Sequence, residues 1–156
     1  MYLDQLKSRA KELEDLYLCK DNLAHNARLI PCTEEEIETL ESRLQLSLPD
    51  AYKEFLLWGG HWARGLMRDS YSFFNSLLNI QEVAVELLEE NQFPEPLSPD
   101  AFVFYMHLSG LFFMFFKISE GNNPPIYIYE EGETLLTFKK EYLSYSDFLA
   151  DELFGN

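Results

Sequence analysis

Positive charge is scarce in this sequence. The 156 residues include 12 lysines and arginines against 27 aspartates and glutamates, which gives a formal net charge of −15. Nucleic acids and anionic membrane surfaces are bound through clusters of lysine and arginine, so this composition argues against both as partners. Solubility alone is one explanation of the acidic excess. The other explanation is a surface that attracts a basic partner.

Cysteine is also scarce, and the spacing of the cysteines and histidines matches no recognisable metal-binding motif. Cys19 and Cys32 form no CxxC motif, and together with the three histidines they match no zinc template. We therefore expect reduced thiols, no metal and no other cofactor. A disulfide between the two cysteines is the alternative.

No segment of the sequence has the length and apolar character of a membrane helix. The longest unbroken apolar run is Leu111–Phe116, far shorter than the roughly 20 residues that such a helix needs. The N-terminal residues are charged and lack the apolar stretch of a secretory signal peptide. These two observations predict a cytoplasmic protein.

The rest of the composition is that of a folded domain, with 47% hydrophobic and 15% aromatic residues. At this length we expect a single domain, 1–156, with an N-terminal helix in 1–28 and a core in 29–156. Apolar residues three and four positions apart predict the first helix at about 2–26. Its inner face consists of Leu3, Leu6, Ala10, Leu13 and Tyr17.

Two further helices are predicted before residue 60. The motif Thr33–Glu36 is a capping box, and its acidic residues suit the positive end of a helix dipole. We therefore interpret this acidic run as structural rather than as a metal site. The next helix should begin with Pro49 in its first position and end in a left-handed conformation at Gly59 or Gly60.

After a predicted helix capped by Asn79 and a proline-rich loop, the hydrophobic period changes from helical spacing to alternation. Gly110 suits a hairpin turn, and the strand after it is apolar on both faces, as in a sheet covered on both sides. Ser144 or Ser146 should cap a closing helix. The expected fold class is α+β, with an antiparallel or mixed sheet of about 4–6 strands flanked by helices. The expected strands lie at 101–107, 111–118, 126–130 and 134–138.

The sequence contains no familiar catalytic motif. It has no HExxH, no GxSxG and no glycine-rich phosphate loop. Of the histidines His25, His61 and His107, the last ends a strand and is interpreted as a structural residue. We therefore expect that the protein is not an enzyme. An unrecognised enzyme would need a pocket in which His61 or His107 meets carboxylates.

The acidic residues are unevenly distributed along the chain. From Asp69 to Phe138 there are eleven acidic residues and one basic residue, Lys117. Helix ends and turns in this stretch are expected to be exposed, where carboxylates project a field at little desolvation cost. The candidate partner-binding residues are Glu89, Glu90, Glu130, Glu131 and Glu133.

The stretch "TEEEIETLESRLQLSLPDAYKEFLLWGG" resembles the opening of the SUKH superfamily, an immunity-protein group that includes the fungal Smi/Knr cell-wall regulators. The later stretches "FVFYMHLSGLFFMFF", "EGNNPPIYIYEEG" and "YSDFL" are similar to the strands, turn and closing helix of bacterial members. The resemblance covers about residues 31–150. It departs from the family pattern at Trp58, where an asparagine is frequent, and at Leu108–Gly110, which replaces a Gln-Gly-aromatic turn.

The resemblance implies a mixed sheet flanked by helices and no catalysis. Bacterial members are immunity proteins that bind and neutralise a cognate toxin, often a nuclease of a polymorphic or contact-dependent system. Fungal members act as regulatory scaffolds, so an interaction module without a toxin is the alternative function. A nuclease needs a basic face to hold phosphate, and an acidic inhibitor is complementary to that face. We therefore expect a cytoplasmic immunity protein whose partner is a basic, nuclease-like protein toxin.

Overall fold

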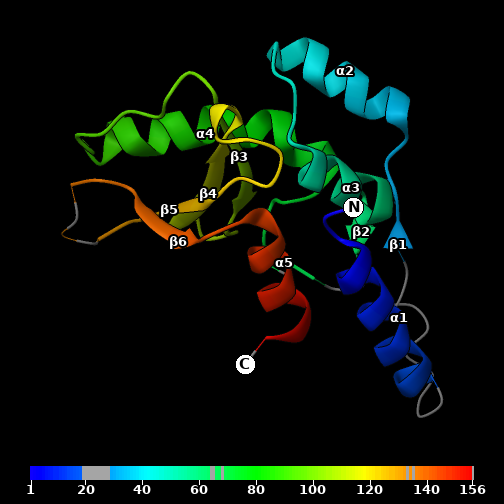
Figure 1. Ribbon diagram of the computed structural model, residues 1–156. Helices are drawn as coiled ribbons and strands as arrows, with labels where there is room; N and C mark the ends of the chain where they lie inside the picture. Colours follow the sequence, from blue (N-terminus) through cyan, green and yellow to red (C-terminus); the bar gives the residue numbers. More distant parts are fainter. Residues whose placement is uncertain (19–28, 64–65, 68, 133, 135, 156) are drawn as a thin grey trace.

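The structure is a computed structural model, shown in Figure 1, and it describes residues 1–18, 29–63, 66–67, 69–132, 134 and 136–155. Its helices and antiparallel sheets make an α+β fold, as the sequence predicts. No helix in these ranges is both long and apolar enough to cross a lipid bilayer. The helices are α1 Asp4–Leu18, α2 Glu34–Leu44, α3 Asp50–Gly59, α4 Leu77–Glu90 and α5 Tyr145–Phe154.

The main sheet is antiparallel and has four strands in sequence order. They are β3 Ala101–Met106, β4 Phe112–Lys117, β5 Ile126–Glu130 and β6 Lys139–Tyr142. A separate two-residue ladder joins β1 Leu29–Ile30 to β2 Trp62–Ala63. Figure 1 shows α4 crossing one face of the main sheet, while α5 lies on the opposite side. Helices on both faces explain why β4 carries apolar side chains on both sides.

The hairpin of β3 and β4 confirms the central sequence prediction. Gly110 in its turn has φ +69°, a left-handed conformation that costs glycine little. Phe113, Phe115 and Phe116 of β4 are completely buried. On the α3 and α5 side, the Phe116 ring lies 5.3 Å from the ring of Tyr52. The aromatic residues of this stretch therefore build the core.

A bulge and a side-chain amide shape the outer strand β3. Its pairing with β4 shifts register between Val103 and Tyr105. Gln81 of α4 donates from Nε2 to the carbonyl of Val103 at 2.6 Å, and its Oε1 accepts the Val103 N–H at 2.9 Å. Both backbone groups of Val103 therefore bond to the helix that covers the sheet.

The fourth strand differs from the prediction. It spans Lys139–Tyr142 rather than 134–138, and its register pairs Ile126 with Tyr142. Apolar alternation predicts strands, and the outer strand lacks it because three of its four residues are charged and exposed. Phe138, assigned to the strand by sequence, instead packs its ring 4.8 Å from that of Phe115.

Helix boundaries also move from their predicted positions. The helix α1 is described from Asp4 to Leu18, and the rest of the predicted helix lies outside the described residues. Pro49 precedes α3 as its N-cap residue instead of occupying the first helical position. The helix α4 begins at Leu77 after a 3₁₀ turn, with Ser76 rather than Asn79 as its N-cap. Leu77 is fully buried, so packing extends the helix toward its N-terminus.

The glycines at the end of α3 serve close packing rather than a left-handed turn. Gly60 has φ −64°, in the ordinary helical region. A Cβ on Gly60 would lie 2.4 Å from Sγ of Cys32, and one on Gly59 would lie 2.8 Å from Cβ of Ala63. Larger residues at these two positions would therefore separate the end of α3 from the segments beside it.

Candidate functional site

The candidate acidic residues come from two segments that the fold brings to one end of the molecule. Figure 1 shows the C-terminal end of α4 and the turn after β5 at the left of the view. The ring of Phe93, just beyond α4, lies 5.1 Å from that of Tyr129 in β5. We call this region the acidic end; its exposed carboxylates are Glu89, Glu90, Glu130 and Glu131. Glu133, the fifth candidate, lies outside the described residues.

A hollow of about 340 Å³ separates the two segments of the acidic end. Its lining includes Phe93, the buried Tyr129 and Leu136, which is 69% exposed. Exposed apolar surface surrounded by charge is typical of a protein contact site. The other lining residues are Asn91, Gln92, Pro94, Glu130, Gly132 and Thr134.

A backbone hydrogen bond anchors the start of the turn after β5. Glu131 donates its N–H to the carbonyl of Leu111 at 2.7 Å, which joins the turn to the neighbouring strand. Gly132 then takes φ +84°, which reverses the chain. Because Glu131 is anchored in this way, the exposed carboxylates of Glu130 and Glu131 project into solvent without the entropic cost of ordering a loose loop.

Lysines border the acidic end on the sheet side. The strand β6 carries Lys139 and Lys140 immediately after the acidic stretch of the sequence. The Nζ atoms of Lys117 and Lys140 lie 4.7 Å and 5.6 Å from the ring centre of Tyr127. The electrostatic field of this region is therefore less uniformly negative than the composition of residues 69–138 indicates.

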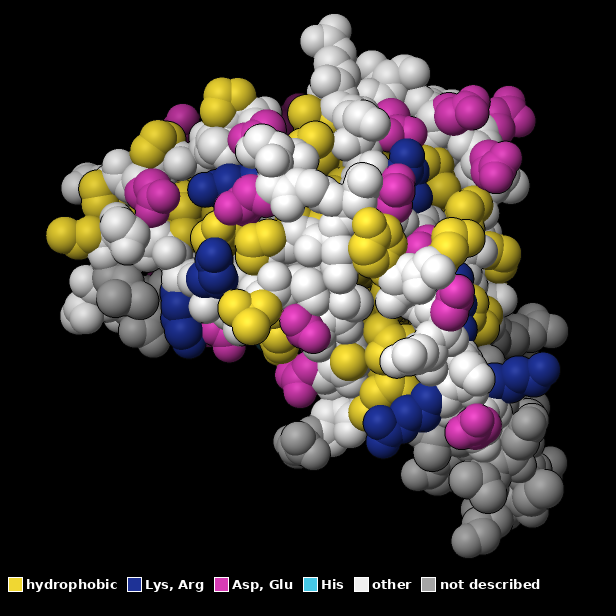
Figure 2. Space-filling view, in the orientation of Figure 1, with side chains coloured by type: hydrophobic (Ala, Val, Ile, Leu, Met, Phe, Trp, Pro, Cys, Tyr) yellow, Lys and Arg dark blue, Asp and Glu magenta, His cyan; other side chains and the backbone are white. Residues whose placement is uncertain are grey.

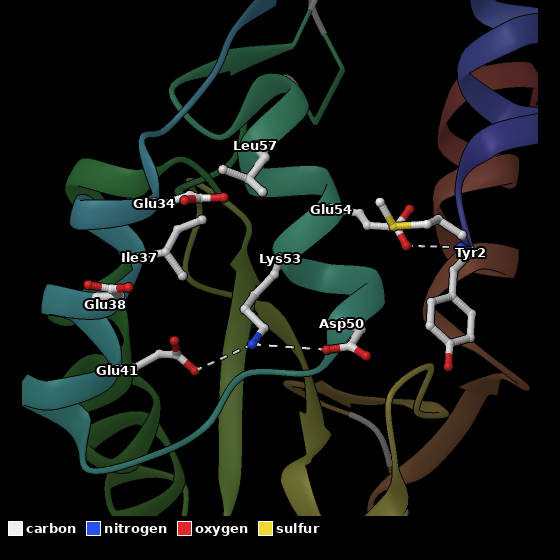
Figure 3. Close-up of a pocket in the computed structure, with 10 residues that line it drawn as sticks. Tyr2, Glu34, Ile37, Glu38, Glu41, Asp50, Lys53, Glu54 and Leu57 are labelled. Carbon is white, nitrogen blue, oxygen red and sulfur yellow. Dashed lines mark hydrogen bonds and ion pairs between the residues drawn. The ribbon is translucent and has the colours of Figure 1, made fainter.

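A second acidic surface is a groove between α2 and α3, which sequence reasoning missed (Figure 3). It encloses about 520 Å³, and Ile37 and Leu57 contribute apolar surface to it. Figure 2 shows acidic side chains gathered over α2, at the upper right of the view. We call this hollow the α2–α3 groove; its carboxylates are Glu34, Glu38, Glu41, Asp50 and Glu54.

Several of these groove carboxylates have structural partners. Glu41 accepts the N–H of Leu48 at 2.7 Å, and its Oε2 lies 3.9 Å from Nζ of Lys53. The same Nζ lies 4.0 Å from Oδ1 of Asp50. Glu34 and Glu38 are exposed at the rim of the groove. These two carboxylates are the ones best placed to meet a basic group of a partner.

The acidic residues at the start of α2 have different roles. Glu36 forms the predicted capping box, since its Oε2 accepts the Thr33 N–H while the Thr33 hydroxyl accepts the Glu36 N–H. Glu34 lines the groove instead. A sequence signal for the groove existed, because Glu34, Glu38 and Glu41 are four and three residues apart and share one helix face.

Glu54 links the start of α1 to α3. Its carboxylate accepts the N–H of Tyr2 at 2.9 Å and that of Leu3 at 3.0 Å, and the residue is only 6% exposed. Helix starts leave unpaired N–H donors that need such acceptors. The side chain of Glu54 in α3 thus caps the N-terminal segment.

We expect Glu54→Ala to lower the free energy of unfolding by about 2 kcal/mol, because the buried N–H of Leu3 and the partly buried N–H of Tyr2 lose a charged acceptor. Glu54→Gln keeps one acceptor oxygen and should cost less. The exposed Glu38→Ala is the matched control, with an expected change within about 0.5 kcal/mol. Urea unfolding of the three variants tests this, and equal midpoints for Glu54→Ala and Glu38→Ala would contradict the capping role.

Cys32, Glu36 and His61 lie together beside the start of α2. Their potential ligand atoms are all within 4.8 Å of one another, and His61 Nε2 lies 3.0 Å from each oxygen of Glu36. Burial, and secondly the charge of Glu36, raises the pKa of the Cys32 thiol to about 12. A nucleophilic cysteine needs a lowered pKa, so this arrangement opposes thiolate catalysis at neutral pH.

The other histidines give no catalytic constellation in the described residues. His107 Nδ1 lies 2.6 Å from Oγ of Ser109, and its ring stacks at 5.0 Å on that of Phe112. These contacts fit its interpretation as a structural turn residue. His25 lies outside the described residues.

Comparison with known protein families identifies the family of this chain. A family model described as the SMI1/KNR4 family (SUKH-1) matches residues 31–151. No curated protein matches the chain. The matched region begins just before α2 and includes the carboxylates of both acidic surfaces, whereas α1 lies outside it.

Proposed function

Since the chain belongs to the SMI1/KNR4 family (SUKH-1), we propose that it is an immunity protein that binds and neutralises a cognate protein toxin in the cytoplasm. The toxin of this proposal is a basic, nuclease-like protein of a polymorphic or contact-dependent system. The observation that carries the proposal is that a chain of net charge −15 exposes carboxylates on an anchored backbone. Such a surface is complementary to the basic face with which a nuclease holds phosphate.

The acidic end is the proposed contact surface. Glu89, Glu90, Glu130, Glu131 and Glu133 would meet basic side chains of the toxin, and the exposed Leu136 would supply apolar contact. Interfaces of this kind combine a desolvated apolar centre with a charged rim that raises the association rate. The α2–α3 groove is the competing contact surface. Charge reversal at the acidic end and at the groove, in separate variants, shows which of the two surfaces the toxin contacts.

Neutralisation in this proposal works by occlusion and needs no chemistry. The buried Cys32 thiol has a pKa of about 12, and His107 bonds to a serine of its own turn. Neither group is prepared to attack a substrate. The immunity protein therefore acts by covering the toxin's substrate-binding face.

The function is tested by purifying the tagged full chain from its native host and identifying the proteins that remain bound. The captured protein is then expressed in a sensitive host with and without the immunity chain. We expect a basic protein that stops growth alone and becomes harmless with its partner. In vitro, it should degrade plasmid DNA or RNA, and one equivalent of the chain should stop the reaction.

A captured partner that is harmless when expressed alone would contradict the immunity function and support the alternative of a regulatory scaffold. A toxic partner without nuclease activity would keep the immunity function but remove the nuclease class. An unrelated acidic protein of similar net charge is the control, because it shows whether inhibition needs this surface or only negative charge.

A further inference from the structure

Three side chains with different donor atoms converge where α2 begins. Cys32 precedes the helix, Glu36 lies in its first turn, and His61 follows the end of α3. The potential ligand atoms all lie within 4.8 Å of one another. We propose that Cys32, Glu36 and His61 bind a divalent metal ion of the zinc class. This site is separate from both acidic surfaces and does not depend on the proposed immunity function.

The backbone around the cluster is fixed by hydrogen bonds between the two segments. Cys32 donates its N–H to the carbonyl of Leu56 at 2.8 Å, and His61 donates its N–H to the carbonyl of Ile30 at 2.9 Å. The imidazole of His61 also lies edge-on to the ring of Phe74, at 5.1 Å between ring centres. The backbone positions of Cys32 and His61 are therefore fixed by hydrogen bonds, while Glu36 is held by the first turn of α2.

The chemistry and spacing of the donors suit zinc. Thiolate sulfur, imidazole nitrogen and carboxylate oxygen are its usual ligands, at about 2.0–2.3 Å from the ion. Tetrahedral ligands at such bond lengths stand about 3.3–3.8 Å apart. His61 Nε2 and the Glu36 oxygens are 3.0 Å apart, slightly closer than this spacing, and the sulfur lies within 4.8 Å of them, so a slight separation of the first pair and an approach of the sulfur would complete the geometry.

Burial differs among the three ligands in a way that leaves access for an ion. Cys32 is 4% exposed, whereas the side chains of His61 and Glu36 are 24% and 36% exposed. Gly60 makes room for the sulfur, because a Cβ there would lie 2.4 Å from Sγ of Cys32. Three protein ligands leave the fourth position to water or to a group from a partner.

This proposal revises the expectation of no metal that the sequence favoured. The cysteine and the histidine are far apart along the chain, so their spacing matches no local zinc motif. The β1–β2 ladder brings them together, since Ile30 pairs with Trp62 between the two ligand-bearing segments. A bound ion would join the start of α2 to the end of α3.

Cobalt titration of the full chain, after removal of metals with a chelator, is the primary test. Co²⁺ should give a thiolate-to-cobalt charge-transfer band in the near ultraviolet and the visible bands of a four-coordinate ion. These bands should saturate at one equivalent and disappear when Zn²⁺ is added. Zn²⁺ in about hundredfold excess over Kd should raise Tm by about 5 °C or more.

Variants assign the ligands. Cys32→Ser should abolish the charge-transfer band, and His61→Gln should weaken metal affinity at least tenfold. Glu36→Gln should do the same while keeping the capping box, because glutamine also serves in that motif, so it separates ligation from folding. Cys19→Ser and His107→Gln are controls that should bind as the native chain does. No cobalt band, a band that survives Cys32→Ser, or one lost in Cys19→Ser would overturn the site.

Discussion

Replacing Phe115 with alanine should lower the free energy of unfolding by about 3–5 kcal/mol, out of the 5–15 kcal/mol typical of a folded domain. The side chain is completely buried in β4. Its ring lies 4.8 Å from that of Phe138 and 5.5 Å from that of Tyr127. Alanine removes these contacts and leaves a cavity that the surrounding sheet cannot close. Phe113→Ala should have a similar cost, because Phe113 is equally buried.

Phe112→Ala is the matched control for this loss of stability. It makes the same chemical change in the same strand, but Phe112 is only partly buried and stacks on Tyr105 and His107 near the turn. We expect it to cost about 1–2 kcal/mol. Urea unfolding of the variants measures the difference. A Phe115→Ala midpoint equal to that of Phe112→Ala would show that the centre of β4 is not the core of the protein.

Changing Glu130, Glu131 and Glu133 together to lysine should slow association with the toxin at least tenfold and abolish protection of cells that express it. Complementary charge raises association rates from about 10⁵–10⁶ toward about 10⁸ M⁻¹s⁻¹ at low salt, so reversing it removes that gain. Glu130 and Glu131 are exposed, so their reversal should leave the fold intact. Stopped-flow binding and a growth assay measure the two effects.

The matched control changes Glu34, Glu35 and Glu38 of α2 to lysine. It alters net charge by the same amount but acts on α2, where Glu34 and Glu38 line the α2–α3 groove. If the acidic end is the contact, this variant should associate much faster than the first, provided that both melt as folded proteins. The reverse order would move the interface to the groove. Added salt should slow association of the native chain more than it changes dissociation, because the Debye length falls from about 10 Å at 0.1 M to about 3 Å at 1 M.

The parts of the fold that sequence predicts are those determined by neighbouring residues. The capping box of Thr33 and Glu36 closes within one helical turn, and the left-handed residue Gly110 specifies its hairpin without distant contacts. The strand β5 lies at Ile126–Glu130, as predicted. Local sequence signals of this kind predict the structure correctly because tertiary packing does not oppose them.

The features that sequence did not predict depend on distant residues. Cys32 and His61 meet only because β1 pairs with β2, and the groove exists only because α2 packs beside α3. The outer strand β6 was misplaced because its residues are polar, and its partner β5 defines it by hydrogen bonding. The pairing of Gln81 with Val103 likewise has no signature in either segment alone.

The two edge strands of the main sheet are protected against strand addition, which affects how a partner can bind. A free sheet edge is a template on which another protein can add a strand through its main chain. At β3, the Gln81 amide occupies the Val103 backbone groups that would accept such a strand, and the isolated bridge between Ser70 and His107 covers its end. At β6, exposed lysines discourage strand addition. Recognition of this protein is therefore expected to proceed through its side chains, which makes its specificity depend on surface residues that can change without altering the fold.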